Sequence, residues 1–216
     1  MNSQTTPITI VECGIGNVGS IANMLKKLGV PHQLASDPEV VARSSKLILP
    51  GVGAFGMGMR RLLETGMVDA LHEAVLRRRV PVLGVCLGMQ LMTRHSEEGD
   101  CEGLGWVDAE TIRFDFSDLN LPTRLPVPHM GWNEVQEVRP CLAMGPVEAA
   151  QRFYFVHSYR VRCNRAENRW LSAHYGVEFD AGVQHGNVIG VQFHPEKSHR
   201  FGLRLLKAFS EVPPPC

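Results

Sequence analysis

The chain has 216 residues, 44% of them hydrophobic, which is enough for one large domain with a sizeable core. Its 22 basic side chains equal its 22 acidic ones and only 7% of its residues are aromatic, which argues against nucleic acid or an anionic membrane surface as a partner. Six cysteines stand at irregular spacings without a C-x-x-C pair, a pattern typical of free thiols in a reducing cytoplasm. We expect a single domain over residues 1–216 with a frayed tail at 212–216, a cytoplasmic location and no membrane-spanning segment.

The first part of the chain alternates strand-like and helix-like patterns. Short apolar runs typical of buried parallel strands are followed by segments whose apolar residues recur at helical spacing. This rhythm predicts an α/β fold, in which a mostly parallel open sheet is flanked by helices. The expected strands cover residues 8–13, 32–35, 46–49 and 80–85, and the expected helices cover 20–28 and 67–78.

From residue 106 onward the pattern changes. Strand-like runs follow one another with few helices between them, and glycine and proline separate the runs. We therefore predict an antiparallel extension of the sheet, closed by a last amphipathic helix. The expected strands cover residues 106–114, 152–161, 170–175, 182–184 and 188–193, and the helix covers 199–210.

The stretch Gly84-Val85-Cys86-Leu87-Gly88 carries the first catalytic signal. A buried strand leads into it and a helical pattern follows it, which makes it the thiol version of the nucleophile elbow. Cys86 would then lie at a helix N-terminus, where the dipole favours the thiolate, and the Leu87 N–H would face a developing oxyanion. Considered alone, the pattern fits a buried structural cysteine between two packing glycines equally well.

The HPE segment at 194–196 offers a base and an orienting group for such a nucleophile. Residues two apart in an extended chain point the same way, so Glu196 can hold one nitrogen of His194 while the other nitrogen faces Cys86. Considered alone, His194 is better explained as a satisfied histidine at the end of a strand. The chain contains 9 histidines, and spacing alone does not choose the base among them.

A third segment, LPGVG at 49–53, follows a predicted strand and is rich in glycine. Peptide groups flanked by glycine rotate at little cost, so a loop of this kind beside the elbow could present a second N–H to a tetrahedral intermediate. Considered alone, the segment favours an ordinary turn.

Together these segments resemble the triad-type, class I glutamine amidotransferases, and among them the glutaminase subunits of imidazole glycerol phosphate synthase. The resemblance extends over nearly the whole chain and implies a flavodoxin-like fold. It rests on these motifs: GIGN at 14–17, LPGVGAFG at 49–56, LGVCLGMQL at 83–91, SEEG at 96–99, PHMGWN at 128–133, FYFVHSY at 153–159 and VQFHPEKS at 191–198.

The resemblance implies a role for each residue that matches a family motif. Cys86 is the nucleophile, His194 the base and Glu196 the group that orients it. The other matched residues concern the oxyanion, the substrate or a partner: Gly51, Val52 and Leu87 for the oxyanion; Gly53, Gln90, Glu98, His157 and Ser158 for glutamine; Asn17, Trp132, Tyr154 and Lys197 for the partner interface.

The resemblance also implies a reaction and a partner. L-glutamine is hydrolysed to glutamate and ammonia through a cysteine thioester, without a metal or cofactor. In a heterodimer, the ammonia passes to a (β/α)₈-barrel synthase subunit like HisF, which makes imidazole glycerol phosphate and aminoimidazole carboxamide ribotide (AICAR) for histidine biosynthesis. Glu12-Cys13 and residues 196–202 depart from the usual pattern. They leave open a related subunit that supplies ammonia for amidation of a sugar in surface polysaccharide.

Two other classes fit parts of the sequence. Residues 14–19 form a literal G-x-G-x-x-G after a predicted strand, and Asp37 follows about twenty residues later, as in dinucleotide-binding domains. That interpretation leaves the other three segments unexplained. A stand-alone cysteine hydrolase or peptidase would use the same triad and differ in its substrate. No H-E-x-x-H motif or Cys/His cluster with ligand spacing indicates a catalytic metal.

Overall fold

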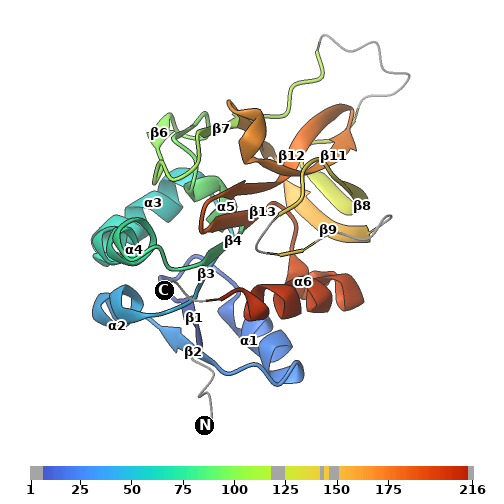
Figure 1. Ribbon diagram of the computed structural model, residues 1–216. Coiled ribbons are helices and arrows are strands. Elements are labelled where there is room, and N and C mark those ends of the chain that lie inside the picture. The colour runs from blue at the N-terminus through green and yellow to red at the C-terminus, as the bar shows by residue number, and fades with distance from the viewer. Residues whose placement is uncertain (1–6, 118–124, 142–143, 146–150, 214–216) are drawn as a thin grey trace.

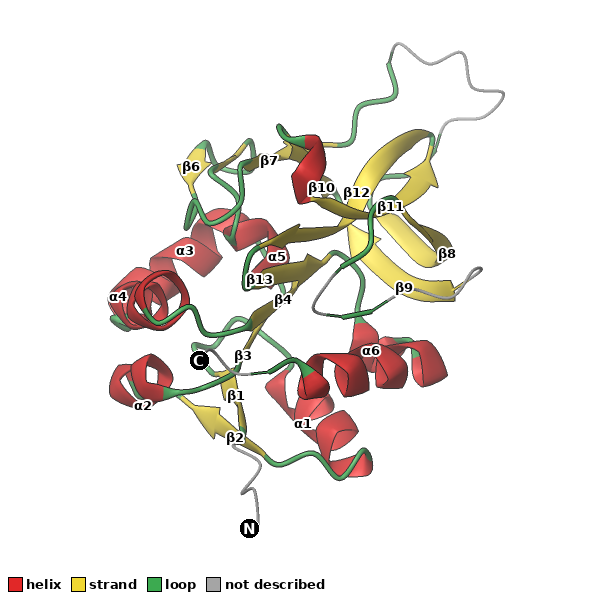
Figure 2. Ribbon diagram, in the orientation of Figure 1, coloured by secondary structure: helices red, strands yellow, loops and turns green. Residues whose placement is uncertain are grey.

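A computed structural model gives the fold and describes residues 7–117, 125–141, 144–145 and 151–213 (Figure 1). Its centre is a parallel sheet with the strand order β2-β1-β3-β4-β13. Helices cover both faces of this sheet (Figure 2), so the predicted α/β fold is confirmed. The parallel strands are β1 (Ile8–Val11), β2 (His32–Ala35), β3 (Leu47–Gly51), β4 (Val82–Cys86) and β13 (Val188–Val191).

The helices form two groups on opposite sides of the sheet (Figure 1). One group consists of α1 (Val18–Lys27) and α6 (His199–Glu211). The other contains α2 (Pro38–Arg43), α3 (Phe55–Glu64) and α4 (Met67–His72), and α4 continues into a π-helical turn, Glu73–Arg77. The short α5 (Leu87–Leu91) follows β4 directly and packs against α3.

Alternating side chains of the central strands contribute to two apolar cores. In β3, Leu47 and Leu49 join the core that contains Leu62 of α3, whereas Ile48 joins the core that contains Phe209 of α6. All five side chains are fully buried. Because both faces of these strands are covered, their sequences are nearly continuous apolar runs, which is the pattern expected of a parallel sheet.

Beyond β13 the sheet continues mainly through antiparallel pairs, as predicted. One row runs through β12, β10 and β7 to the short strands β5 and β6, and a branch from β12 runs through β11 and β8 to β9. The bounds are β5 (His95–Ser96), β6 (Cys101–Glu102), β7 (Ala109–Arg113), β8 (His129–Glu137), β9 (Gln151–His157), β10 (Tyr159–Cys163), β11 (Arg169–Tyr175) and β12 (Val177–His185).

The helices α2 and α3 and the strands β5, β6 and β8 are not among the elements predicted from the sequence. For α2 the local signals are present, because Asp37 accepts from the Glu39 N–H at 2.9 Å and Pro38 begins the helix. The helix α3 has no side-chain cap of its own. Instead the Glu98 carboxylate accepts from the Phe55 N–H at 2.8 Å, and a cap that comes from a distant loop cannot be read from the local sequence.

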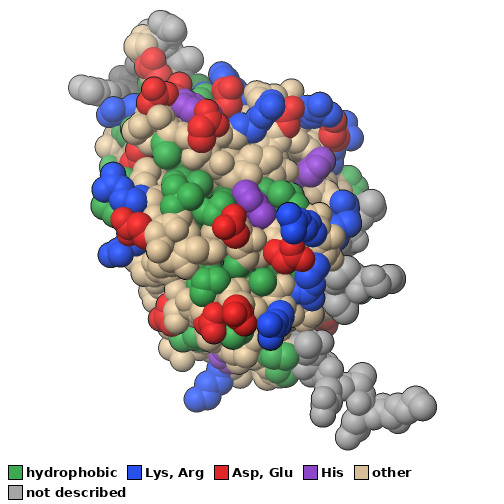
Figure 3. All heavy atoms as spheres, turned by 90° about the vertical axis from the view of Figure 1, so that its left-hand side faces the viewer, with side chains coloured by type: hydrophobic (Ala, Val, Ile, Leu, Met, Phe, Trp, Pro, Cys, Tyr) green, Lys and Arg blue, Asp and Glu red, His purple; other side chains and the backbone are tan. Residues whose placement is uncertain are grey.

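The surface carries mixed charge, in keeping with the neutral composition. On the face formed by α2, α3 and α4, acidic and basic side chains are interspersed (Figure 3). No helix in the described ranges is both long and apolar enough to cross a membrane. Val212, which we expected in a frayed tail, is instead buried beside α6, and residues 214–216 lie outside the described part of the chain.

Candidate active site

Cys86 occupies the turn between β4 and α5. It is the last residue of β4, and α5 begins at Leu87. Its backbone has φ 53° and ψ −111°, a conformation that costs a non-glycine residue on the order of 1–3 kcal/mol. Strand, strained residue and helix follow one another as in a nucleophile elbow, so Cys86 has the geometry that the sequence predicted.

The glycines around the elbow allow close backbone contacts. A Cβ on Gly88 would lie 1.8 Å from the Leu49 carbonyl oxygen, and a Cβ on Gly84 would lie 2.8 Å from the Gly88 oxygen. Gly51 pairs with Cys86 between β3 and β4, and a Cβ there would lie 2.7 Å from the Gly88 nitrogen. The end of β3 and the elbow therefore pack backbone against backbone, which only glycine permits.

His194 follows β13 and brings the second catalytic group to the elbow. Its Nδ1 lies 2.8 Å from Oε1 of Glu196, and the two side chains are 3% and 4% exposed. An ionised carboxylate can only accept, so Nδ1 carries a proton and Nε2 remains for Cys86. The Ser198 hydroxyl fixes this segment, since it donates to the His194 carbonyl at 2.6 Å and accepts from the Tyr154 N–H at 3.0 Å.

Opposing effects set the pKa of His194. Burial lowers this pKa, but interactions with Cys86 and Glu196 outweigh burial and raise it to about 9. Within the described residues, Nε2 of His194 is buried without a hydrogen-bond partner. A histidine with this pKa is protonated at neutral pH, and an imidazolium beside a thiolate is the activated form of a cysteine nucleophile.

Cys86 and His194 line a pocket of about 430 Å³, a size typical of small-molecule sites. Gly51 and Glu196 support its lining from behind, through Leu87 and His194 respectively. Most residues predicted for the oxyanion and for glutamine come together in this lining from separate segments: Val52, Gly53, Leu87, Gln90, Glu98, His157 and Ser158, together with Lys197 from the predicted interface.

The oxyanion segment differs from the expectation. The Val52 N–H donates to the Ile15 carbonyl, in the loop after β1, and is therefore not available to an oxyanion in this structure. Next to it, Gly53 has φ +102°, a left-handed conformation that favours glycine. Leu87, in contrast, is the first residue of α5, where an amide has no acceptor within its helix. The Leu87 N–H is therefore placed as predicted, whereas the Val52 N–H is bound to Ile15.

Gln90 contacts the protein as well as the pocket. Its Nε2 donates to the Tyr159 carbonyl oxygen at 3.1 Å and to Oε1 of Gln192 at 3.0 Å. Both amide hydrogens of Gln90 are thereby engaged, so a ligand would meet its amide oxygen. The carboxylate of Glu98, which caps α3, would likewise be shared between that helix and a ligand.

His157 belongs to a buried chain of neutral polar groups. Its Nδ1 lies 2.7 Å from the Tyr159 carbonyl oxygen, so Nδ1 carries the proton, and Nε2 accepts from Nδ1 of His129 at 3.0 Å. Burial lowers the pKa of His157 to about 3 and that of His129 to about 4. Both rings are therefore neutral and hydrogen-bonded, which makes them poor bases and favours His194 among the candidate histidines.

Three of the four residues predicted to face a partner lie together. Trp132 is 40% exposed, and its ring stacks on His199 and meets the Tyr154 ring edge-on, with centroid distances of 5.4 and 6.3 Å. Nζ of Lys197 lies 5.4 Å from the centre of the Tyr154 ring. The fourth residue, Asn17, caps the N-terminus of α1.

The glycine-rich loop at 14–19 supports the oxyanion segment. A Cβ on Gly16 would lie 2.9 Å from the Pro50 side chain, and the Ile15 carbonyl accepts from the segment that follows Pro50. Asp37, the supposed ribose ligand of the dinucleotide interpretation, caps α2. These contacts give the loop a structural purpose within the site around Cys86.

Sequence reasoning missed two groups beside the nucleophile. Gln192 is fully buried, and its Nε2 lies 3.7 Å from Sγ of Cys86. Gln192 stands two residues before His194, but it lies in a bend after β13 and not in a regular strand, so strand periodicity does not mark it. Tyr159 acts through its main-chain carbonyl, and no side-chain pattern marks such a group.

The sequence matches the glutamine amidotransferase class I family over residues 9–211. Solved structures with the same fold include a glutamine amidotransferase, with a TM-score of 0.72 and 19% identity over 94% of this chain and 97% of that one. PurLQS from Thermotoga maritima has a TM-score of 0.71 and 16% identity over the same shares. The family match covers most of the chain, which therefore belongs to the class I glutamine amidotransferases.

Relatives of higher identity carry the name of one subunit within that family. Imidazole glycerol phosphate synthase subunit HisH 2 of Methanococcus maripaludis is 45% identical over 94% of this chain and 98% of its own. HisH 2 of Pseudomonas aeruginosa is 44% identical over 95% and 99%. HisH of Bdellovibrio bacteriovorus is 45% identical over 95% and 100%. The chain is thus similar to HisH subunits along almost its entire length.

Proposed function

We propose that the chain is the glutaminase subunit of an imidazole glycerol phosphate synthase and supplies ammonia for histidine biosynthesis. The observation that carries this proposal is the meeting of Cys86 with the buried His194–Glu196 pair at one pocket. The similarity to HisH subunits supports the same function.

The geometry leads to a two-step reaction. The Cys86 thiolate attacks the side-chain carboxamide carbon of glutamine, and the C–N bond breaks as the His194 imidazolium gives its Nε2 proton to the departing ammonia. A glutamyl thioester on Cys86 remains. The neutral His194 then takes a proton from water, which attacks the thioester and releases glutamate. Glu196 stabilises the imidazolium whenever it forms.

Substrate binding follows from the lining of the pocket. Glu98 supplies a carboxylate for the α-ammonium group of glutamine, and Gln90 supplies an amide oxygen. Gly53, His157 and Ser158 line the same pocket and would contact the α-amino-acid end of glutamine. With its α-amino-acid end held by these residues, glutamine would place its side-chain amide over Cys86. This arrangement favours glutamine over a peptide or ester.

Oxyanion stabilisation requires a rearrangement. The Leu87 N–H serves as one donor, and the Val52 N–H becomes the second donor after it leaves Ile15. Ile15 and Asn17 belong to one loop, so a partner that contacts Asn17 can alter the hydrogen bond at Ile15. We propose that the present arrangement is a resting form and that partner binding releases the Val52 peptide.

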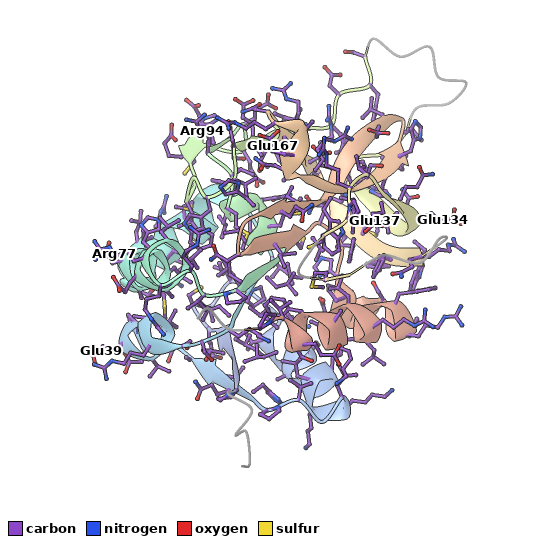
Figure 4. The ribbon with its side chains drawn as sticks, viewed as in Figure 1. Glu39, Arg77, Arg94, Glu134, Glu137 and Glu167 are labelled. Carbon is purple, nitrogen blue, oxygen red and sulfur yellow. The ribbon has the colours of Figure 1, made fainter. Side chains whose placement is uncertain are left out.

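The partner that we propose is a (β/α)₈-barrel synthase subunit like HisF, bound as a heterodimer on the surface around Trp132 and Lys197. On the same strand, Met130 is 62% exposed and Glu134 points outward (Figure 4). Lys197 also lines the pocket, so this surface borders the pocket mouth. A subunit docked there would cover the mouth and receive ammonia before water protonates it.

A complementation experiment tests the pathway. The names of the similar proteins support histidine biosynthesis and do not favour the polysaccharide alternative. We expect this chain, expressed with the barrel subunit of its source, to restore growth without histidine to a bacterium that lacks HisH, and Cys86→Ala to abolish that growth. Failure to grow while the soluble complex hydrolyses glutamine would contradict the pathway but not the glutaminase.

A further inference from the structure

A chain of two buried amides connects a main-chain carbonyl with the nucleophile. Gln90 Nε2 donates to the Tyr159 carbonyl oxygen at 3.1 Å and to Gln192 Oε1 at 3.0 Å. Gln192 Nε2 donates to Cys86 Sγ at 3.7 Å. Gln90 is 5% exposed and Gln192 is 0% exposed, so water does not compete for these contacts.

The Tyr159 carbonyl, at the end of the hydrogen-bond series farthest from Cys86, fixes the orientation of both amides. A main-chain carbonyl only accepts, so the end of the Gln90 amide that faces Tyr159 must be its NH₂ group. The second hydrogen of that group is then directed to the oxygen of Gln192. With its oxygen held by Gln90, Gln192 must turn its own NH₂ group toward the sulfur. A flip of either amide would bring two donors or two acceptors together.

We propose that Gln192 stabilises the Cys86 thiolate through an N–H···S contact, and that Gln90 is a positioning residue that keeps Gln192 turned toward the sulfur. The inference rests on the proposed role of Cys86 as the nucleophile. A hydrogen bond to a charged acceptor is stronger than one to a neutral acceptor, so this contact favours the thiolate over the thiol. The amide thereby acts on the same sulfur as the His194 imidazolium.

The amides could instead serve only to join α5 to the segment that follows β13. Such a structural role would affect melting temperature but not the ionisation of the sulfur. The pH dependence of Cys86 alkylation by iodoacetamide separates the two possibilities, because thiolate is the reactive form. The full chain is used without glutamine or partner, and the Cys86 peptide is followed by mass spectrometry.

Replacing the donor is the first test. Gln192→Met keeps the length of the side chain but removes the N–H, so the midpoint of alkylation against pH should rise by about one unit, equivalent to about a tenfold loss of thiolate. Gln192→Glu should raise it further, because a carboxylate repels the thiolate. Gln184→Met is the matched control: Gln184 donates to the Pro140 carbonyl away from Cys86, so the midpoint should not move.

Replacing the positioning residue tests the connection between the amides. Gln90→Met should cause a smaller shift than Gln192→Met, because Gln192 keeps its N–H but loses the partner that orients it. The double variant should shift no further than Gln192→Met alone, since the two residues act in series. Melting temperatures identify any variant that fails to fold, and the remaining variants still decide the question.

The outcomes separate this inference from the proposed function. The proposed role of the amides is overturned if the midpoint is unchanged in folded Gln192→Met or Gln192→Glu, or if the shifts in the double variant are fully additive. The proposed function still stands in that case if the complex hydrolyses glutamine. Absence of selective Cys86 alkylation in the unaltered chain, together with absence of glutamine hydrolysis, overturns the proposed function itself.

Discussion

The two halves of the site differ in how completely they are assembled. The half with Cys86, His194 and Glu196 is buried, and short contacts hold it in place. In the oxyanion half, Val52 is 48% exposed and its backbone N–H donates to the Ile15 carbonyl. In the proposed mechanism, this difference would let a glutaminase keep its nucleophile in place and withhold transition-state stabilisation, often the largest catalytic contribution, until a partner is present.

Among the substitutions that probe the two halves of the site, removal of the nucleophile should lower glutamine hydrolysis the most. Cys86→Ala should lower glutamine hydrolysis by the complex by about 10⁴-fold or more, and His194→Ala by nearly as much, because the catalytic groups act as a unit. Hydrolysis is measured as glutamate formed, together with a melting curve. Cys101→Ala, which changes a half-buried cysteine outside the pocket, serves as the control. Substantial turnover by Cys86→Ala would exclude this residue as the nucleophile.

Removal of the second oxyanion donor should have the next largest effect. Val52→Pro deletes the N–H, so turnover by the complex should fall by about 10²- to 10³-fold. Val52→Ala keeps the N–H and should change turnover little. Cys86 in the isolated Val52→Pro chain should still react with iodoacetamide at the unaltered rate. Equal turnover by Val52→Pro and Val52→Ala would show that this amide takes no part in catalysis.

Glu196→Gln should have a smaller effect with a characteristic pH dependence. The carboxylate helps to raise the pKa of His194 to about 9 and thus keeps the acid for the departing ammonia protonated. Turnover should therefore decline as pH rises through about 9 in the unaltered complex. In Glu196→Gln this decline should begin at lower pH, and the maximum should fall by roughly 10- to 100-fold. If the decline in turnover at alkaline pH occurred at the same pH in Glu196→Gln, Glu196 would not be the group that raises the pKa of His194.

The raised pKa of His194 also makes the stability of the fold depend on pH. Because the pKa of His194 is raised on folding, its protonation stabilises the fold fully below the unfolded pKa, and this contribution is lost as pH rises through about 9. Charge on the buried His194–Glu196 pair therefore supports the fold at neutral pH.

The sequence predicted those features that have a local origin. Continuous apolar runs indicated the parallel sheet, and the glycines around Cys86 indicated the elbow. The HPE segment paired His194 with Glu196 correctly, although a 3-10 turn, Pro195–Lys197, brings the carboxylate to the ring rather than the extended chain that was expected. Each of these signals is confined to a few neighbouring residues, which is why they could be read without the fold.

Features that depend on distant contacts could not be predicted in this way. The hydrogen bond from Val52 to Ile15 joins two loops through their backbones, and no side chain marks it. Glu98 caps α3 from a separate loop. Within the helix predicted at 67–78, the apolar Leu76 is 51% exposed, because the π-helical turn at 73–77 changes the helical period there.

The central claim is that the isolated chain has an activated nucleophile but an incomplete oxyanion site. The most direct test measures two rates on one preparation of the isolated chain: alkylation of Cys86 at neutral pH, and glutamine hydrolysis relative to the complex with the barrel subunit. We expect Cys86 to be alkylated faster than Cys101, and hydrolysis to be lower than in the complex by about 100-fold or more. Full hydrolysis by the isolated chain, or an unreactive Cys86, would contradict the account.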